Sequence, residues 1–172
     1  QQITLQDHTS QQRLIRERVK LQLAEEVNQV LREEIAGHRR TQEQLQRSKR
    51  FARNLIDSSL DMIMAADQDG RITEYNPAAS IRFGYEPHEV VGLNTQVLYA
   101  DPAEFERVHK EMDQHGVFAG EVRNIDKFGG VFTSYLAASR LFDDTGALIG
   151  AMGVSRDITL MKRDQEALRA SE

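Results

Sequence analysis

The feature that most constrains the fold is a long proline-free stretch near the start of the chain. From Gln11 to about Ser58 there is no Pro and one Gly, Gly37, and Leu, Glu, Gln, Arg and Ala predominate. These residues favour helix, so the stretch predicts one continuous helix of about 70 Å. Such a helix is too long to pack on the small remaining domain, so it needs a partner. Residues 1–10 are Gln-rich and patternless, and we expect them to be frayed.

Apolar side chains recur along residues 11–58 with the three- and four-residue spacing of a coiled coil. The predicted seam consists of Leu14, Leu21, Asn28, Leu31, Ile35 and Leu45. A polar Asn in such a seam fixes register and oligomeric state at some cost in stability. We therefore expect a signalling helix that forms a parallel coiled-coil homodimer. Further apolar residues beside the stripe leave a larger bundle, a second register or an amphipathic helix without a defined partner as alternatives.

Charge and composition exclude several classes of function. Residues 1–56 carry a net charge of +4 and residues 57–172 a net charge of −9. The basic residues of the helix alternate with Glu and lack aromatic neighbours, so we expect no nucleic-acid partner. No stretch has the roughly 20 apolar residues of a membrane span, and no signal peptide is visible. We expect a cytoplasmic fragment without membrane contact, from a longer protein that can itself be membrane-anchored.

Residues 59–158 predict one compact α+β domain, because short strand patterns flank a group of short helices. The predicted strands are Met62–Ala66, Arg71–Asn76, Phe118–Asp126, Val131–Phe142 and Ala147–Ser155. The predicted helices are Pro77–Phe83, Glu86–Val90 and a longer one that Asp101 caps and Gly116 ends. We expect a five-stranded antiparallel sheet with the helices on one face. Residues 159–172 predict a short exit helix, with a heptad of Ile158, Met161, Gln165 and Leu168.

Three motifs in this domain, in order, resemble those of the PAS family. Asp67–Ala79 is similar to the first hairpin and helix entry of that family, and Phe83–Gly92 to its Gly-Tyr-x-x-x-Glu-aliphatic-aliphatic-Gly segment. Arg156–Thr159 resembles the Asp-Ile-Thr motif that joins the last strand to a signalling helix. The resemblance covers about residues 52–160 and implies the PAS fold.

The resemblance implies a sensory module of a bacterial multidomain signalling protein. The expected parent is a histidine kinase of a two-component system or a cyclic-di-GMP enzyme, with the output domain on the same chain. The module relays a ligand- or conformation-dependent signal, and Asp157 and Thr159 couple the last strand to the exit helix. A nine-residue pattern beginning at Arg40 recurs at Arg163, as expected if this domain is one of several consecutive domains that are joined by equivalent helices. The alternative is a ligand-free dimerisation spacer.

No catalytic machinery is expected within these residues. The sequence has no phosphate-binding Gly-rich loop, no Gly-x-Ser-x-Gly elbow and no His-Glu-x-x-His pair. The chain has no Cys, which excludes disulfides and thiolate metal ligands, and no metal site is expected. Asp143 and Asp144 fall in a predicted turn, where Asp is favoured for backbone reasons. Gly150 and Gly153 lie in a predicted strand, where small residues permit close packing.

The candidate ligand pocket lies between the predicted sheet and helices, with a filled core as the alternative. Its candidate residues are Met64, Ile81, Phe105, Val108, His109, Met112, Val122, Asn124, Tyr135, Met152 and Val154. Asn124 and Tyr135 are the expected polar anchors for a small ligand.

We expect no bound cofactor, with haem and flavin as the alternatives that the resemblance implies. Haem would use His109 or His115 as its axial ligand. A flavin would contact Asn124. Thr95 occupies the position of the reactive Cys in the light-sensing branch of the family, so a cysteinyl-flavin adduct is excluded.

Overall fold

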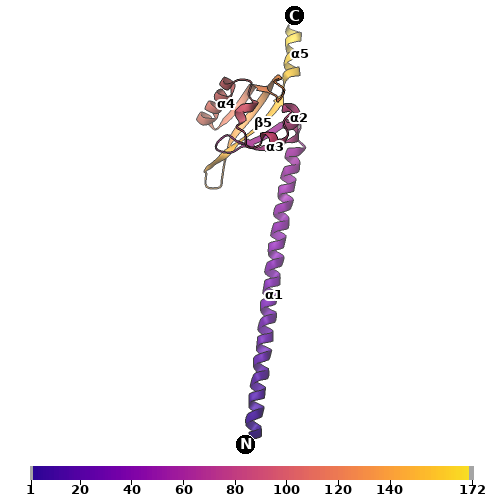
Figure 1. Cartoon of the computed structure of the whole chain (residues 1–172), viewed down its shortest axis with the longest axis vertical. Helices are drawn as coiled ribbons and strands as arrows, with labels where there is room; N and C mark the ends of the chain where they lie inside the picture. The colour runs from indigo at the N-terminus through magenta and orange to yellow at the C-terminus, as the bar shows by residue number, and fades with distance from the viewer. Residues whose placement is uncertain (1, 171–172) are drawn as a thin grey trace. The chain divides into compact units, whose positions relative to one another are not determined.

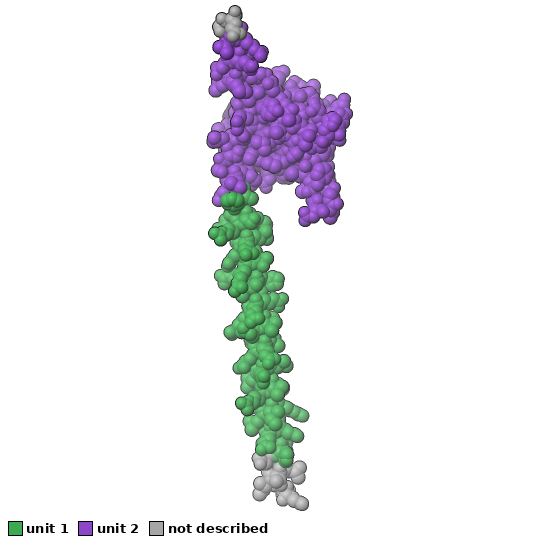
Figure 2. All heavy atoms as spheres, turned by 180° about the vertical axis from the view of Figure 1, so that it is seen from behind, with its two compact units in different colours: residues 1–52 green, residues 53–172 purple. Residues whose placement is uncertain are grey.

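The computed structural model describes residues 2–170, with side chains described from His8 onward. The chain divides into two compact units, residues 1–52 and 53–172, coloured separately in Figure 2. Helix α1 spans Gln2–Asp57, so it forms the described part of the first unit and the start of the second. Each unit is described by itself.

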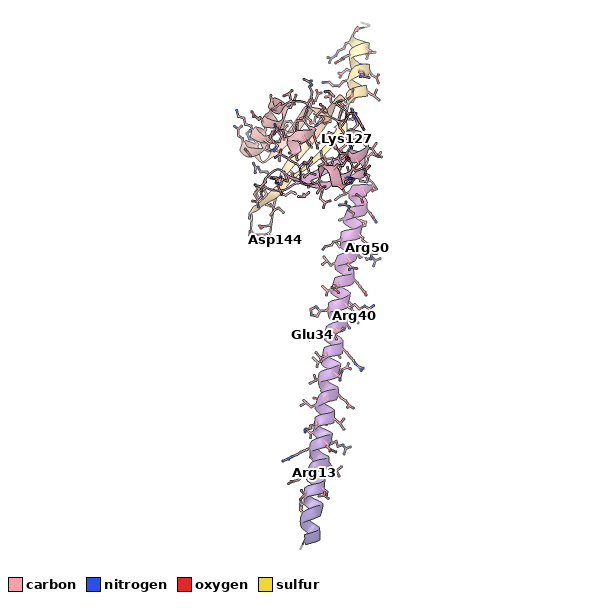
Figure 3. All side chains as sticks on the ribbon, viewed as in Figure 1. Arg13, Glu34, Arg40, Arg50, Lys127 and Asp144 are labelled. Atoms are coloured by element: carbon pink, nitrogen blue, oxygen red, sulfur yellow. The ribbon has the colours of Figure 1, made fainter. Side chains whose placement is uncertain are left out.

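The α1 segment is one uninterrupted helix, as the proline-free stretch predicts. It begins at Gln2, so the segment expected to be frayed is helical from that residue onward. Pairs such as Gln29–Glu33 and Arg39–Glu43 join successive turns along it. Figure 3 shows side chains projecting from the helix along its length, among them the labelled Arg13 and Glu34.

The predicted seam residues of α1 have no covering partner in the described part of this chain. Their exposed fractions are 65% for Leu14, Leu21 and Ile35, 54% for Leu45 and 49% for Leu31. Burying such side chains supplies most of the stability of an amphipathic helix in water. The exposed stripe therefore leaves α1 with apolar surface that a second helix can cover.

The second unit is built on a five-stranded antiparallel sheet, which confirms the expected fold class. The strands are β1 (Met62–Ala66), β2 (Ile72–Tyr75), β3 (Val117–Ile125), β4 (Val131–Phe142) and β5 (Leu148–Asp157). Their order in the sheet is β2-β1-β5-β4-β3. The last strand, which Figure 1 labels β5, thus lies between the first and the fourth.

Two of the helices between β2 and β3 begin and end at the residues the sequence indicates, and a third begins at Pro87, one residue later than expected. The elements between these strands are α2 (Pro77–Phe83), α3 (Pro87–Val90), the 3₁₀ turn η1 (Thr95–Leu98) and α4 (Pro102–His115). Asp101 caps α4 through its side chain, which accepts from the Glu104 amide, and Gly116 ends it with a φ of 76°. The sequence analysis did not predict η1. The exit helix α5 spans Thr159–Ala170.

Two clusters of buried side chains form the core on one face of the sheet. The first includes Ile72, Phe83 and Phe132, and the second includes Val108 and Leu136. Ile158 is only 7% exposed, so the residue expected to open the exit heptad is buried at the edge of the domain. The exposed apolar residues near the start of α5 are Leu160 and Met161.

Asn76 connects three segments at the start of the domain. Its Oδ1 accepts from the backbone amides of Ile63 and Ala79, at 2.9 and 3.0 Å. Its Nδ2 donates to the carbonyls of Ile56 and Asp61, at 3.1 and 3.0 Å. The residue is 1% exposed, so its side chain supplies hydrogen bonds to these backbone groups inside the protein, although the Ile56 carbonyl also accepts from the Ser59 amide.

We expect Asn76→Ala to lower the free energy of unfolding by about 3 kcal/mol, because it leaves several buried polar groups without partners. Urea unfolding followed by circular dichroism measures this loss. The control is Asn54→Ala, an exposed substitution within α1, which should change stability by less than about 0.5 kcal/mol. A loss for Asn76→Ala no larger than that of the control contradicts the role assigned to Asn76.

Candidate functional site

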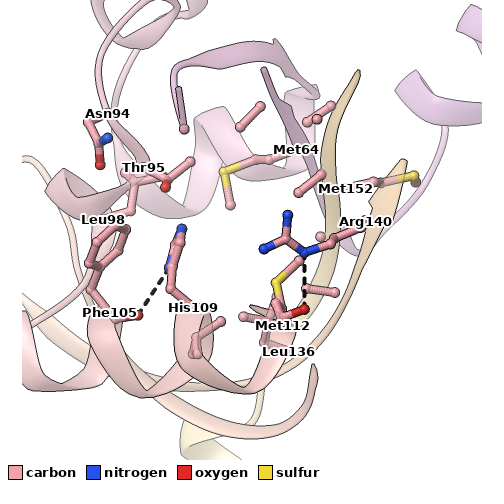
Figure 4. A pocket seen from close by; sticks show the side chains of 18 of the residues that line it. Met64, Asn94, Thr95, Leu98, Phe105, His109, Met112, Leu136, Arg140 and Met152 are labelled. Atoms are coloured by element: carbon pink, nitrogen blue, oxygen red, sulfur yellow. Dashed lines mark hydrogen bonds between the residues drawn. The ribbon is translucent and has the colours of Figure 1, made fainter. Parts of the chain in front are cut away.

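A cavity of about 290 Å³ lies between the inner face of the sheet and helix α4 (Figure 4). Its volume is near the lower end of the range for small-molecule sites. The wall is mainly apolar and includes Met64, Leu98, Phe105, Val108, Met112, Val122, Leu136, Ala138 and Ala151. The β1–β2 turn at residues 67–70 also lines it. The second unit therefore contains a cavity in the region where the sequence analysis gave a filled core as the alternative to a ligand pocket.

Most of the predicted pocket residues border this cavity. They are Met64, Phe105, Val108, His109, Met112, Val122, Asn124 and Met152. Ile81, Tyr135 and Val154 are not among its lining residues. Ile81 is 85% exposed on α2 and Tyr135 is 48% exposed on β4. The structure does not support Tyr135 as a polar anchor inside the cavity.

The two misplaced strand residues, Tyr135 and Val154, share one cause, the phase of the pleat, whereas Ile81 lies on the exposed face of α2. Ala138 of β4 faces the cavity and pairs with Gly153, whereas Ala137 pairs with Val154 on the opposite face. Met152 shares that outer face, so it borders the cavity without directing its side chain into it, as Figure 4 shows. The small residues of β5 point inward and leave the space that larger side chains would fill.

The glycines of β5 permit close packing, as predicted. A Cβ atom on Gly150 would lie 2.1 Å from the carbonyl oxygen of Ala66. A Cβ atom on Gly153 would lie 3.2 Å from Cδ1 of Leu136. The first distance is impossible without moving the backbone, so Gly150 is required for the approach of β5 to β1.

Two nitrogen-bearing side chains enter the cavity from different elements. His109 of α4 stacks on Phe105, with ring centroids 3.9 Å apart, and its Nδ1 lies 3.1 Å from the Phe105 carbonyl oxygen. Arg140 of β4 donates from Nε to the Met112 carbonyl oxygen at 3.0 Å and forms an ion pair with Asp113. The sequence analysis missed Arg140. Its position two residues after Ala138, on the same face of β4, is the signal that would have found it.

Asn124 belongs to an internal hydrogen-bond network. Its Nδ2 donates to the Leu98 carbonyl at 2.9 Å, and its Oδ1 accepts from the Ser134 hydroxyl at 2.6 Å. It is 5% exposed. The amide thus ties η1 to β3 and β4, and its described bonds point to the protein itself.

The residues present do not fit a flavin. Asn124, the expected flavin contact, and Asn94, the other Asn that lines the cavity, are both used internally: Asn94 caps Gln96 and donates to the Asp69 carbonyl, and Asn124 bonds Leu98 and Ser134. The cavity volume also suits a molecule smaller than flavin or haem. Over the part of the chain that the structure describes, no cluster of three His, Cys, Asp or Glu side chains could hold a metal ion.

Tyr99 contributes a neutral phenol to the cavity wall. Its ring meets Phe105 edge to face, with centroids 5.5 Å apart. Burial, together with the charge of Glu104, raises the pKa of Tyr99 to about 12. The phenol therefore adds no negative charge to the cavity near neutral pH.

A second cluster joins the end of β5 to the exit helix. Asp157 accepts from the Thr159 amide at 2.8 Å through Oδ1 and from Arg82 Nε at 2.5 Å through Oδ2. Arg82 also stacks over the Phe132 ring, 3.4 Å from its centroid. The Thr159 hydroxyl oxygen lies 3.2 Å from the Thr133 amide nitrogen and accepts its hydrogen bond. The two residues predicted to couple strand and helix thus meet α2 and β4 as well.

The pKa of Asp157 reflects opposing effects. Burial favours the protonated acid, but hydrogen bonds from Thr159 and Arg82 and the charge of Arg82 outweigh it and lower the pKa. A lowered pKa stabilises the fold above the ordinary Asp value, near pH 4, and this stabilisation disappears as the pH falls through the folded-state pKa.

We expect Arg82→Gln to raise the pKa of Asp157 towards its ordinary value, because the main charged partner is removed. The pH dependence of unfolding below about pH 4 should become shallower in Arg82→Gln and in Asp157→Asn. A double-mutant cycle with both substitutions, followed by urea unfolding at neutral and acidic pH, isolates the pairwise contribution. Additive effects at neutral pH contradict an interaction between the two side chains.

Two curated histidine kinases are similar in sequence to this chain. The chain is 29% identical over 126 residues to the signal transduction histidine-protein kinase AtoS of Escherichia coli (strain K12), covering 69% of the chain and 19% of AtoS. It is 30% identical over 156 residues to the methanogenesis regulatory histidine kinase FilI of Methanothrix harundinacea (strain 6Ac), covering 83% of the chain and 17% of FilI. The chain thus spans less than a fifth of the length of these curated relatives.

Structural comparison and the family match agree. The crystal structure of a PAS domain of a protein from Colwellia psychrerythraea superimposes with a TM-score of 0.59 at 25% identity, over 64% of this chain and 96% of that one. The family described as PAS domain matches residues 60–160, the region that contains the sheet, the cavity and the Asp157 cluster. The chain belongs to the PAS domain family.

Proposed function

We propose that this chain is the sensory module of a cytoplasmic or membrane-anchored bacterial signalling protein, with an output domain on the same chain. In this proposal a small molecule binds in the cavity and Asp157 passes the change to α5. The kinase relatives support a histidine kinase as the output, ahead of a cyclic-di-GMP enzyme.

The observation that carries the proposal is the double role of β5. The strand lines the cavity through Ala151 and Gly153, and it ends at Asp157, which is hydrogen-bonded to both α2 and α5. A ligand that displaces the middle of β5 therefore acts on the same element that holds the exit helix. Since Asp157 and Arg82 are each about one-third exposed, their ion pair is weak enough for a small bias to shift its population.

Dimerisation through α1 is the second part of the proposal. Leu21, Leu31 and Ile35 expose apolar surface at heptad-related positions, and Asn28 supplies the polar residue that sets register. In a parallel dimer, each seam position of α1 lies beside the same position in the second copy of the chain. This arrangement also brings the two α5 helices to the same end of the assembly, where an output domain can respond to both.

We expect the wild-type chain to sediment as a dimer and Leu31→Glu to weaken dimerisation by at least about tenfold, because the substitution places a charge in the seam. Sedimentation equilibrium measures the dissociation constant. Gln44→Glu, which adds the same charge outside the seam, is the matched control and should leave the dimer intact. A monomeric wild type, or equal effects of the two substitutions, contradicts the proposed seam.

Ala138 and Ala137 give a matched test of ligand binding, because they are neighbours on opposite faces of β4. Native mass spectrometry of the protein as purified should detect a bound small molecule. We expect Ala138→Leu, which fills the cavity, to lose it and Ala137→Leu to retain it.

The alternative, a ligand-free dimerisation spacer, gives a different result. The wild type would carry no small molecule, and Ala138→Leu would simply stabilise the domain by filling empty apolar space. That outcome contradicts the sensor proposal.

A further inference from the structure

We infer that the ligand of this cavity is a short-chain carboxylate whose carboxylate group binds Arg140 in place of Asp113. The inference rests on the proposed function, since it names the class of molecule that the cavity binds. Three properties carry it: the placement of Arg140, the exposure of Asp113 and the position of Arg140 as the only Lys or Arg among the described lining residues.

Arg140 is held in a position to meet a ligand. Its side chain is 25% exposed, and Nε is fixed by the Met112 carbonyl oxygen. Figure 4 shows the guanidinium projecting from β4 into the cavity, among Met64, Met112 and His109. The bonds described for it use Nε and Nη2, so the N–H groups of Nη1 remain for a bound molecule. A guanidinium presents paired donors that match the two oxygens of a carboxylate.

Asp113 is a weak competitor for the same cation. It lies in the last turn of α4, and its side chain is 65% exposed, so its ion pair with Arg140 is screened by water. A carboxylate that enters from inside the cavity meets Arg140 against apolar walls, where the attraction is stronger. If a ligand carboxylate replaces Asp113 on Arg140, the ion pair that joins the C-terminal turn of α4 to β4 is lost.

The other polar groups of the cavity do not take this role. Because a carbonyl oxygen only accepts, Nδ1 of His109 donates to Phe105, so the ring has one nitrogen, Nε2, left for a ligand, whereas a guanidinium presents paired donors. Asp67 and Asp69 line the cavity at the β1–β2 turn, where Asp67 accepts the amides of Asp69 and Arg71, and neither carboxylate can bind a ligand carboxylate. Among the described lining residues, Arg140 is the only Lys or Arg.

The size and polarity of the walls define the rest of the ligand. A volume of about 290 Å³ admits a short molecule, and the lining around Leu98, Val108 and Leu136 is hydrocarbon. The fitting class is therefore a small monocarboxylate with an apolar body. A dicarboxylate would place its second charge against apolar walls without a cation.

The test is a titration of the whole ¹⁵N-labelled chain, stripped of bound molecules by unfolding and refolding, followed by NMR. The probes are sodium acetate, butanoate and hexanoate, with butanamide as the uncharged match and sodium chloride as the ionic-strength control. We expect butanoate to shift resonances of cavity residues and to bind at least about tenfold more weakly to Arg140→Met. Asp113→Asn should bind butanoate about threefold more tightly, because the competing charge is gone. Butanamide should bind both variants as it binds the wild type.

The opposite effects of the two substitutions separate recognition from a structural role. If Arg140→Met does not fold, Asp113→Asn still decides, because it keeps the cation at position 140. The inference is overturned if butanamide binds as tightly as butanoate, if Asp113→Asn weakens butanoate binding, or if no carboxylate binds. None of these results removes the proposed sensor function, which fails separately if the purified wild type carries no small molecule that Ala138→Leu excludes.

Discussion

Strand β5 is the element on which the rest of the domain depends, because it is hydrogen-bonded along both edges. It pairs with β1 from Met62 to Ala66 and with β4 over most of its own length. This central position joins the hairpin at the start of the domain to the strands at its end. The approach to β1 requires Gly150, where a side chain would collide with the backbone of Ala66. A small displacement of β5 therefore cannot remain local, since both neighbouring strands must follow it.

The same strand relates the cavity to the exit helix. Its inward residues, Ala151 and Gly153, are small and leave space beneath α4, and its last residue, Asp157, fixes the first turn of α5. Packed interiors leave few voids, so hollow space lined by Met, Leu and Phe side chains is an unusual feature of a domain core. No helix in residues 2–170 is long and apolar enough to cross a membrane. In the relay proposed here, the signal enters through the cavity and leaves along α5.

The element order, the helix caps and the coupling motif could be predicted from the sequence because they depend on local chemistry. Asp101 before Pro102 and Gly116 after His115 mark the ends of α4 through hydrogen bonds and backbone angles within a few residues. Asp157 and Thr159 were identified through a motif, and their mutual bond is equally local. Their roles in signalling stay predictions.

The parts that escaped prediction depend on contacts between distant segments. The face of the sheet on which Met152 and Val154 lie follows from the pairing of β5 with β4, and alternation alone does not say which face is buried. The partners of Asp157 and Asp113, which are Arg82 and Arg140, lie 75 and 27 residues away. Asn124 looked like a ligand contact because its bonds to Leu98 and Ser134 exist only in the folded domain.

The most direct test of the account is a distance measurement between the exit helices of the dimer. The chain has no Cys, so Glu166→Cys gives one spin-labelling site in each copy. Double electron–electron resonance then compares the protein as purified with protein stripped of its bound molecule by unfolding and refolding. The account predicts that the distance distribution shifts on stripping and that Asp157→Ala removes the shift. Identical distributions in loaded and stripped wild type, with loss of the bound molecule verified by mass spectrometry, would contradict the proposed relay.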